Sequence, residues 1–484
     1  VNSGDINGVP VHASKYPLTD VLRGELGFKG VIDSDWQDII KLHTVHHVAA
    51  TQKDAVLMAV NAGIDMSMVP LDYSCGKLLK ELVREGKVPE SRIDASVRRI
   101  LELKKELGLF ANPYPEPEAA KNFGKPEYHL VALKAAEEAM TLLKNADSTL
   151  PLSKSDRVLV TGPAANSLSA LNGCWSYTWQ GRDEKLYPKR EPTIVDAIRQ
   201  KIGANNVSYE WGVDFDGKAV DIDAAVASAK QADVVVLCLG EDSYAETPGD
   251  INDLDLPEGQ QELAKRLYAT GKPVVLVLVE GRTRIIREIV PGAKGILMAY
   301  WPGSEGALAI ANVLFGDTNP SGKLPVTYQR YPNNLITYDR KYSTEMDQFD
   351  PPKGHKAVEN MPQWDFGYGL SYTTFEYKHL KLNSSVLKSG GKLSVSVDVA
   401  NTGKRAGVET VELYTHELYA SIAPPQKRLR AFRRVSLQPG ETKTVSFELA
   451  PRDLAFVNAE SKAVTEPGDF EVMIGGLKAA FRYE

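Results

Sequence analysis

Val274-Val275-Leu276-Val277-Leu278-Val279 is a run of six consecutive β-branched or leucine residues, and a similar run, Val234-Val235-Val236-Leu237-Cys238, precedes it. Uninterrupted apolar runs predict strands that are buried on both faces, because a strand with one wet face alternates apolar and polar residues. Further short apolar runs lie at 158–160, 207–209 and 295–298. The segment 126–330 therefore predicts an α/β sandwich with a mostly parallel sheet.

The sequence before this sandwich also alternates short apolar runs with amphipathic segments. Strands are expected at 30–32 and 63–68, and helices at 53–62, 73–85 and 90–107. About two strand–helix units fit into this length, whereas a closed barrel of this type needs eight. Residues 1–112 are therefore predicted to form a partial (β/α)8-type barrel remnant.

The end of the chain has a different period. From about residue 373, apolar and polar residues alternate in the runs 393–399, 408–414 and 443–449, and turn sequences separate these runs. Short alternating strands at this spacing predict an antiparallel β-sandwich. The predicted organisation is a barrel part, a proline-rich linker, the α/β sandwich, a connector without periodicity and the β-sandwich, at 1–112, 113–125, 126–330, 331–372 and 373–484.

Composition narrows the classes of function. The chain has 484 residues, 43% hydrophobic and 25% charged, with a net charge of −6, so it offers no general attraction to nucleic acid or to an anionic membrane. No apolar run is long enough to span a bilayer. The expected partner is a neutral small molecule or polymer, and the oligomeric state is left open.

Cysteine usage and the first residues say little about compartment. The three cysteines, Cys75, Cys174 and Cys238, are far apart and odd in number, so they predict neither a disulfide framework nor a clustered metal motif. The chain starts at Val1 without a methionine or a signal-like segment, and we expect it to be an interior piece of a longer product.

The first candidate for chemistry is Asp35-Trp36, which follows the apolar run Gly30-Val31-Ile32. A carboxylate can attack or stabilise an oxocarbenium-like centre, and a broad aromatic ring offers a flat face to a sugar. The alternative interpretation is a strand end with a solvated Asp and a core Trp, since acids at such positions are also common helix N-caps. The residues themselves leave both interpretations open.

Ordered motifs along the chain resemble glycoside hydrolase family 3. The segment Leu18–Gly30, which runs into Ser34-Asp35-Trp36, is similar to the family segment that bears the nucleophile. Further matching segments are Ile93–Leu101, Trp301–Gly306, Phe315–Pro325 and Phe366–Tyr372. The resemblance implies a barrel, an α/β sandwich and a C-terminal fibronectin type III-like β-sandwich. It also implies a retaining exo-acting β-glycosidase, a β-glucosidase first and a β-xylosidase as the near alternative.

The resemblance assigns roles to particular residues. Asp35 matches the nucleophile, and Glu246, on a loop after the strand at 234–238, matches the acid/base. Glu241 on the same loop is interpreted as a structural acid, because a proton donor must reach the scissile oxygen. Trp36 and Trp179 would hold the leaving-group sugar between them. Trp175 would lie nearer the reacting ring, although two tryptophans four residues apart are also typical of core packing.

The same resemblance raises an alternative function. The resemblance implies that family members hold the non-reducing sugar with residues from earlier barrel strands, and we expect the sequence given to begin after those strands. The alternative is therefore a truncated, catalytically inactive fragment with at most carbohydrate-binding ability. The substrate under the first hypothesis is a β-linked oligosaccharide or glucoside. The compartment is unknown, and the resemblance implies a periplasmic or secreted protein.

Other features are interpreted without a function. Asp33 departs from the family pattern, and strand alternation would place it on the same face as Asp35. His43, His46 and His47 have helical spacing but no acidic partner or cysteine nearby, so we expect no metal site. The basic run 427–434 predicts a solvated strand face. The segment 161–165 lacks G-x-G-x-x-G, which disfavours a dinucleotide site. The resemblance to the glycosidase family implies no cofactor.

Overall fold

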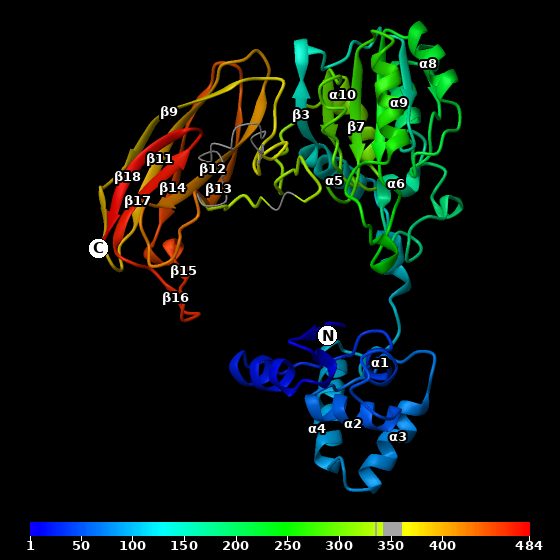
Figure 1. The fold of residues 1–484 in the computed structure, drawn as a ribbon, viewed down its shortest axis with the longest axis vertical. Coiled ribbons are helices and arrows are strands. Elements are labelled where there is room, and N and C mark those ends of the chain that lie inside the picture. Colours follow the sequence, from blue (N-terminus) through cyan, green and yellow to red (C-terminus); the bar gives the residue numbers. More distant parts are fainter. Residues whose placement is uncertain (334–335, 342–360) are drawn as a thin grey trace, which may run out of the picture. The chain divides into compact units, whose positions relative to one another are not determined.

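The computed structural model describes residues 1–333, 336–341 and 361–484. The chain separates into two compact units, Val1–Phe123 and Gly124–Glu484, which are described in turn (Figure 1). The predicted connector at 331–372 lies partly outside the described residues, at 334–335 and 342–360.

The first unit is mostly helical. Its longer helices are α1 (Asp38–Thr44), α2 (Gln52–Ala62), α3 (Ser74–Arg84) and α4 (Glu90–Glu106), and a π-helix covers Tyr16–Glu25. A short hairpin pairs β1 (Asp5–Ile6) with β2 (Val9–Pro10). The buried core is centred on α2, which buries Ala55, Val56 and Ala59. A capping box between Thr51 and Asp54 fixes the start of this helix.

The two strands predicted in this unit are reduced to a single bridge. Asp33 and Met66 pair in parallel, with the Ser34 N–H donating to the Met66 carbonyl at 3.0 Å. The buried carboxylate of Asp65 explains why the pairing does not extend along 30–32. It accepts the backbone N–H of Ile32 at 3.1 Å, the donor that a neighbouring strand would otherwise bind. The sequence prediction of regular strands here is therefore wrong.

The second unit begins with an α/β sandwich around a six-stranded sheet. The strand order is β3 (Thr141–Asn145), β8 (Gly295–Met298), β7 (Val274–Val279), β6 (Val234–Gly240), β4 (Val158–Thr161) and β5 (Val207–Glu210). β3 pairs antiparallel with β8 at one edge, and the other neighbours are parallel. The mostly parallel sheet expected from the uninterrupted apolar runs is confirmed.

Helices cover both faces of this sheet (Figure 1). Alternate residues of β7 belong to two separate cores, with Val275 and Val277 on one side and Leu276 and Leu278 on the other. The first core includes α5 (Pro126–Ala139), α6 (Leu168–Asn172), α7 (Ile194–Ile202) and α10 (Gly306–Leu314). The second includes α8 (Ile222–Gln231) and α9 (Glu258–Tyr268). Burial on both faces is the reason why β6 and β7 contain no polar side chain.

The chain ends in a β-sandwich. One sheet has the order β10 (Val386–Leu387), β18 (Leu477–Tyr483), β17 (Gly468–Ile474), β12 (Gly407–Glu417) and β13 (Arg428–Leu437). The other has the order β14 (Thr442–Leu449), β11 (Leu393–Asn401) and β9 (Phe375–Leu382). Along β11, buried and partly buried residues alternate strictly, which confirms the period of two. The basic run lies on β13, where Arg433 and Arg434 are exposed.

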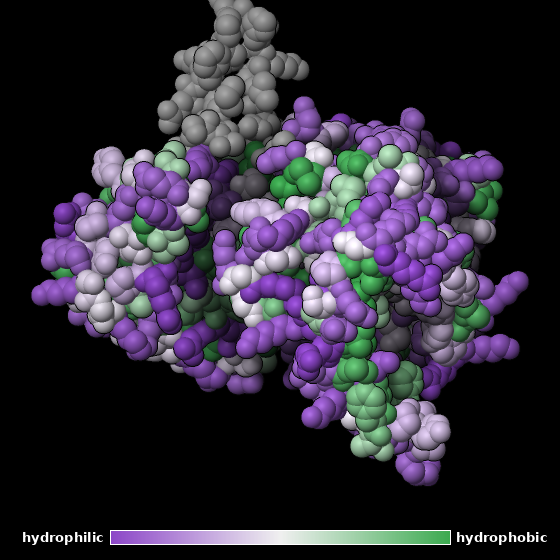
Figure 2. All heavy atoms as spheres, turned by 90° about the horizontal axis from the view of Figure 1, so that it is seen from below, coloured by the Kyte–Doolittle hydropathy of each residue, from purple (hydrophilic) through white to green (hydrophobic). Residues whose placement is uncertain are grey.

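The face seen in Figure 2 is mostly hydrophilic, with groups of hydrophobic side chains between the polar ones. Within the described residues, no helix combines the length and the apolar character that a membrane crossing requires.

Candidate active site

Asp35 lies in the first unit, in the turn between the Asp33–Met66 bridge and α1. Its carboxylate accepts the backbone N–H of Trp36 at 2.6 Å and the hydroxyl of Ser3 at 3.0 Å. The hydrogen bond from Trp36 is the main reason why the pKa of Asp35 is lowered from its ordinary value. The side chain is exposed. An ionised, accessible carboxylate is the state in which an Asp can act as a nucleophile.

A buried histidine holds the backbone of Asp35. The N–H of Asp35 donates to Nε2 of His12 at 3.1 Å, and Nδ1 of His12 lies 3.5 Å from the carboxylate of Asp38. Lys41 pairs with the other oxygen of Asp38 at 2.6 Å. Nε2 can accept only when it carries no proton, so this geometry requires neutral His12 with its proton on Nδ1. Burial lowers the pKa of His12 and favours that neutral form.

The neighbours of Asp35 differ in their surroundings. Trp36 is 53% exposed, so it is a surface ring and not the core residue of the alternative interpretation. Asp33 is less accessible, and its Oδ1 is buried without a hydrogen-bond partner. Burial raises the pKa of Asp33. The structure therefore separates two acids that are two residues apart, one with a raised and one with a lowered pKa.

Glu246 lies in the second unit on the acid loop (residues 241–250), which follows β6 at the carboxyl end of the sheet. Its side chain is exposed, and its backbone has φ 53° and ψ −146°. A non-glycine residue rarely adopts this conformation, and such conformations persist only where the surroundings enforce them. The Gly249 N–H donates to the Glu246 carbonyl at 2.7 Å and closes the turn.

Trp175 and Trp179 lie on the aromatic loop (residues 172–182), which follows α6 in the same unit. Both rings are exposed, at 67% and 45%, so neither is a core residue. The Trp175 N–H donates to the Trp179 carbonyl at 3.0 Å and closes the loop between them. The backbone of Trp175 has a positive φ of 58°. Exposed indoles on a constrained loop can stack on a sugar ring.

The aromatic loop and the acid loop are directly hydrogen-bonded. The carboxamide of Gln180 binds both the N–H and the carbonyl of Ala245, each at 3.1 Å. The structure thus brings Trp179 and Glu246 into one assembly within the second unit, while Asp35 and Trp36 form an adjacent pair in the first. Gln180 and His12 were both missed by sequence reasoning, because each acts on a residue distant in the chain and neither belongs to a local motif.

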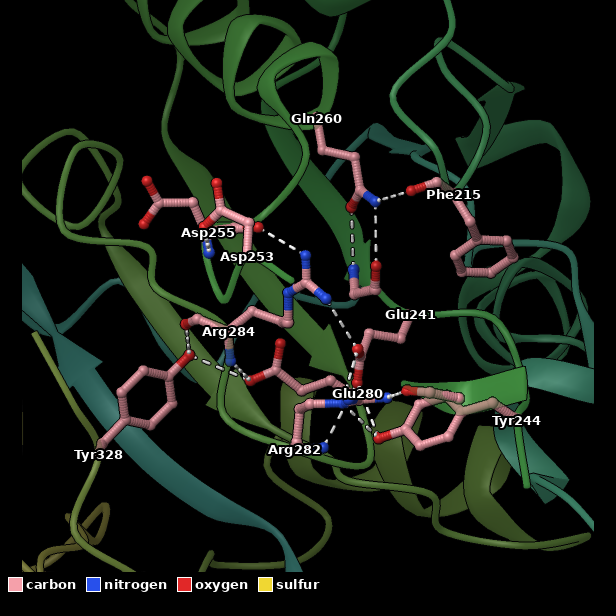
Figure 3. A network of polar contacts seen from close by, with 12 residues as sticks. Phe215, Glu241, Tyr244, Asp253, Asp255, Gln260, Glu280, Arg282, Arg284 and Tyr328 are labelled. Atoms are coloured by element: carbon pink, nitrogen blue, oxygen red, sulfur yellow. Dashed lines mark hydrogen bonds and ion pairs between the residues drawn. The ribbon is translucent and has the colours of Figure 1, made fainter. Parts of the chain in front are cut away.

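Glu241, unlike the exposed Glu246, lies in a network of polar side chains (Figure 3). It is buried and binds two guanidinium groups, Arg284 at 3.0 Å and Arg282 at 3.1 Å. Arg282 also donates to the hydroxyl of Tyr244 at 2.8 Å and to the Gly249 carbonyl at 2.6 Å. These contacts hold both ends of the acid loop to the turn after β7. They fit the interpretation of Glu241 as a structural acid.

A second acid in this network is fully buried. Glu280 accepts the hydroxyl of Tyr328 at 3.0 Å, and its other oxygen has no hydrogen-bond partner (Figure 3). Burial, with the nearby charge of Glu241, raises the pKa of Glu280 to about 8. Both neighbouring guanidinium groups are already paired with Glu241. Glu280 is therefore the neutral member of the network at pH 7.

A cavity of about 260 Å³ with a mixed polar and apolar lining lies beside the acid loop, and its lining residues include Arg182, Phe215, Asp242 and Tyr244. Over residues 1–333, 336–341 and 361–484, no three or more His, Cys, Asp or Glu side chains are grouped as a metal site would require. Nδ1 of His43 lies 3.0 Å from the Ala49 carbonyl, and Nδ1 of His47 lies 3.0 Å from the carbonyl of His43.

Family comparisons cover the chain in three segments. Residues 1–103 match the glycosyl hydrolase family 3 N terminal domain, and residues 140–372 match the glycosyl hydrolase family 3 C-terminal domain. Residues 409–478 match a fibronectin type III-like domain.

Individual relatives match along almost the whole chain. A lysosomal beta glucosidase of Dictyostelium discoideum is 43% identical over 98% of this chain and 59% of its own length. A periplasmic beta-glucosidase of Salmonella typhimurium is 37% identical over 97% of this chain and 65% of its own. A beta-xylosidase of Formosa agariphila is 36% identical over 98% of this chain and 67% of its own. The chain thus spans about three fifths to two thirds of the length of these relatives.

Solved structures show the same fold. A β-glucosidase from Erythrobacter marinus matches with a TM-score of 0.87 and 33% identity, over 100% of this chain and 67% of its own. A mutant β-glucosidase from Listeria innocua, in complex with laminaribiose, matches with a TM-score of 0.87 and 32% identity, over 99% of this chain and 66% of its own.

The first unit, which matches the N-terminal family domain and keeps one parallel bridge of the half-barrel, the α/β sandwich and the fibronectin type III-like sandwich together define a protein of the glycoside hydrolase class. The chain belongs to glycosyl hydrolase family 3, as its ordered motifs indicated.

Proposed function

We propose that the chain carries the chemistry of a retaining, exo-acting β-glycosidase that removes terminal non-reducing β-D-glucosyl residues. The strongest support is the 43% identity to a β-glucosidase along 98% of the chain. The exposed Asp35 with its lowered pKa and the exposed Glu246 on its constrained loop add to it.

The proposed reaction is a double displacement. Ionised Asp35 attacks the anomeric carbon while Glu246 protonates the leaving glycosidic oxygen, and a covalent glycosyl–enzyme forms. Glu246 then takes a proton from water, which attacks the same carbon and releases the sugar and the Asp35 carboxylate. This mechanism requires the two carboxyl groups to come within about 5–5.5 Å during the reaction. Trp36, Trp179 and Trp175 would stack on the substrate.

A β-xylosidase is the second candidate, because one relative at 36% identity has that name. The two sugars differ by the hydroxymethyl group at C5. Comparing kcat/KM for 4-nitrophenyl β-D-glucoside and 4-nitrophenyl β-D-xyloside separates the two, and preference for the xyloside would overturn the assignment of glucose.

The test of the enzyme hypothesis is turnover of 4-nitrophenyl β-D-glucoside by the chain, by Asp35→Asn and by Asp20→Asn as a matched control. Asp20 lies in the same unit and forms an exposed ion pair with Lys15. We expect turnover by the parent chain and by the control, and its loss in Asp35→Asn. Equal background rates in all three would refute the proposal and are the result expected of an inactive fragment. Proton NMR of the first-formed sugar tests retention, since an α-anomer would exclude it.

A further inference from the structure

The aromatic loop and the acid loop meet along a seam of side-chain to backbone hydrogen bonds. Gln180 Nε2 donates to the Ala245 carbonyl and Gln180 Oε1 accepts the Ala245 N–H. One carboxamide therefore satisfies both backbone polar groups of a buried residue, as an adjacent strand would.

Neighbouring residues continue this seam. Ser243 Oγ donates to the Gln180 carbonyl at 2.5 Å, and Arg182 Nε donates to the Ser243 carbonyl at 2.6 Å. Between them, Gly181 has φ +68°, and a Cβ there would lie 2.2 Å from the Gly173 carbonyl oxygen. The two loops are therefore held together by polar contacts from Gln180 and Arg182 of the aromatic loop to Ser243 and Ala245 of the acid loop. Within the aromatic loop, Gly181 packs against Gly173 at a distance that only glycine allows.

These hydrogen bonds connect the chain segments that carry Trp179 and Glu246, the two residues of the second unit to which the proposed reaction assigns stacking and proton transfer. Gln180 directly follows Trp179, and Ala245 directly precedes Glu246. Glu246 also has the uncommon backbone conformation, which its surroundings must enforce. On one side of it the Gly249 N–H closes the turn, and on the other side Gln180 fixes both polar groups of Ala245.

We propose that Gln180 is a positioning residue that sets the Glu246 carboxylate relative to the Trp179 indole, so that sugar stacking and protonation of the leaving group share one geometry. The inference deepens the proposed function and rests on it. Because Gln180 acts through Ala245, its loss should weaken acid catalysis and leave attack by Asp35 unchanged.

Leaving-group dependence distinguishes this role from a merely structural one. A 2,4-dinitrophenyl glucoside needs little protonation as it departs, whereas a phenyl glucoside needs full help from the acid. For Gln180→Ala we expect kcat/KM to fall about 10–100-fold with the phenyl glucoside and less than about threefold with the dinitrophenyl glucoside. Gln180→Glu keeps the shape of the side chain but cannot donate to the Ala245 carbonyl. The same selective loss is expected for it.

The matched control is Gln200→Ala, at an exposed position on α7 in the same unit, which should leave both rates unchanged. An equal loss with the two glucosides in Gln180→Ala and Gln180→Glu would overturn the proposal, because a general disturbance of the loop weakens both reactions alike. Wild-type rates in both variants would also overturn it.

Amide hydrogen exchange tests the contact between Gln180 and Ala245 without measuring turnover. Peptides covering 243–250 should exchange at least about tenfold faster in Gln180→Ala than in the parent chain and in Gln200→Ala. Unchanged exchange would overturn the positioning role even in an active enzyme. If the parent chain hydrolyses no aryl β-glycoside but exchange accelerates in Gln180→Ala, the proposed glycosidase function fails. The role of Gln180 in holding the acid loop is then still supported.

Discussion

Replacing Glu280 with glutamine should make the protein more stable at alkaline pH and leave its stability in mild acid nearly unchanged. Glu280 is fully buried, and its pKa is raised from the ordinary 4.5 to about 8, mainly by that burial. Glutamine has the shape of the protonated acid and keeps an oxygen for the hydroxyl of Tyr328. The variant therefore reproduces the neutral form at every pH.

The direction in which the free energy of unfolding changes with pH follows from proton binding. Between pH 4.5 and 8 the unfolded chain releases the Glu280 proton while the folded chain keeps it, so the free energy of unfolding falls as pH rises. At about 1.4 kcal/mol per pH unit, the shift from 4.5 to about 8 corresponds to at most roughly 5 kcal/mol by pH 8. The Glu280→Gln variant should not show this decrease in the free energy of unfolding, because glutamine does not ionise.

The assay is urea unfolding of both chains at pH 5, 6, 7 and 8. We expect the midpoints to differ little at pH 5 and the variant to unfold at progressively higher urea, relative to the parent, up to pH 8. The control Glu288→Gln changes an exposed acid eight residues away, which pairs with Arg287, and should show no such trend. A difference between Glu280→Gln and the parent that stays constant from pH 5 to 8 would refute the reasoning, because Glu280 would then be ionised in the folded protein or accessible to water.

Three further predictions concern other named contacts. Asp65 has a fully buried side chain that binds Arg23 and Arg99. Asp65→Ala should therefore lower the free energy of unfolding of the first unit, measured in urea, by about 3–5 kcal/mol. A loss below about 1 kcal/mol would contradict this expectation. His12→Ala removes the acceptor of the Asp35 N–H. Amide exchange at Asp35 should accelerate, and kcat should fall by a larger factor than KM rises. Unchanged exchange at Asp35 would refute the importance of this hydrogen bond. Trp179→Ala should weaken binding of a disaccharide by about 1–2 kcal/mol but of free glucose little, as titration calorimetry can measure, and equal losses would argue against stacking on the leaving-group sugar.

The parts of the fold that were predicted correctly depend on local patterns. The β6 and β7 runs are apolar at every position because both faces of the sheet are covered, and burial of this kind can be read from consecutive residues. The alternation along β11 is equally local. The strand predicted at 30–32 failed because Asp65, more than thirty residues away, binds the N–H of Ile32. No pattern within 30–32 records that competitor.

Residues of the candidate site also differ in whether a local sequence pattern could indicate them. Asp35 and Glu246 could be proposed from the sequence because long motifs surround them. The exposure of Trp36, Trp175 and Trp179 excluded the core interpretation only when the structure was known. Gln180 lies 65 residues before Ala245, and its importance depends on a loop contact that no spacing rule describes. The same holds for His12, which lies 23 residues before Asp35.

The acids of this chain fall into two groups according to how they are held. Asp65 and Glu241 are buried and fixed through their own carboxylates by two or more guanidinium groups, an arrangement that leaves neither carboxylate free to contact a substrate. Glu246 is instead located through the backbone of its neighbour Ala245, and the His12 contact fixes the backbone of Asp35. Positioning through the backbone leaves an acid with an accessible carboxylate that a substrate can reach. This difference is the physical reason for assigning chemistry to Asp35 and Glu246 and structure to Glu241, and the Gln180 and His12 variants test it directly.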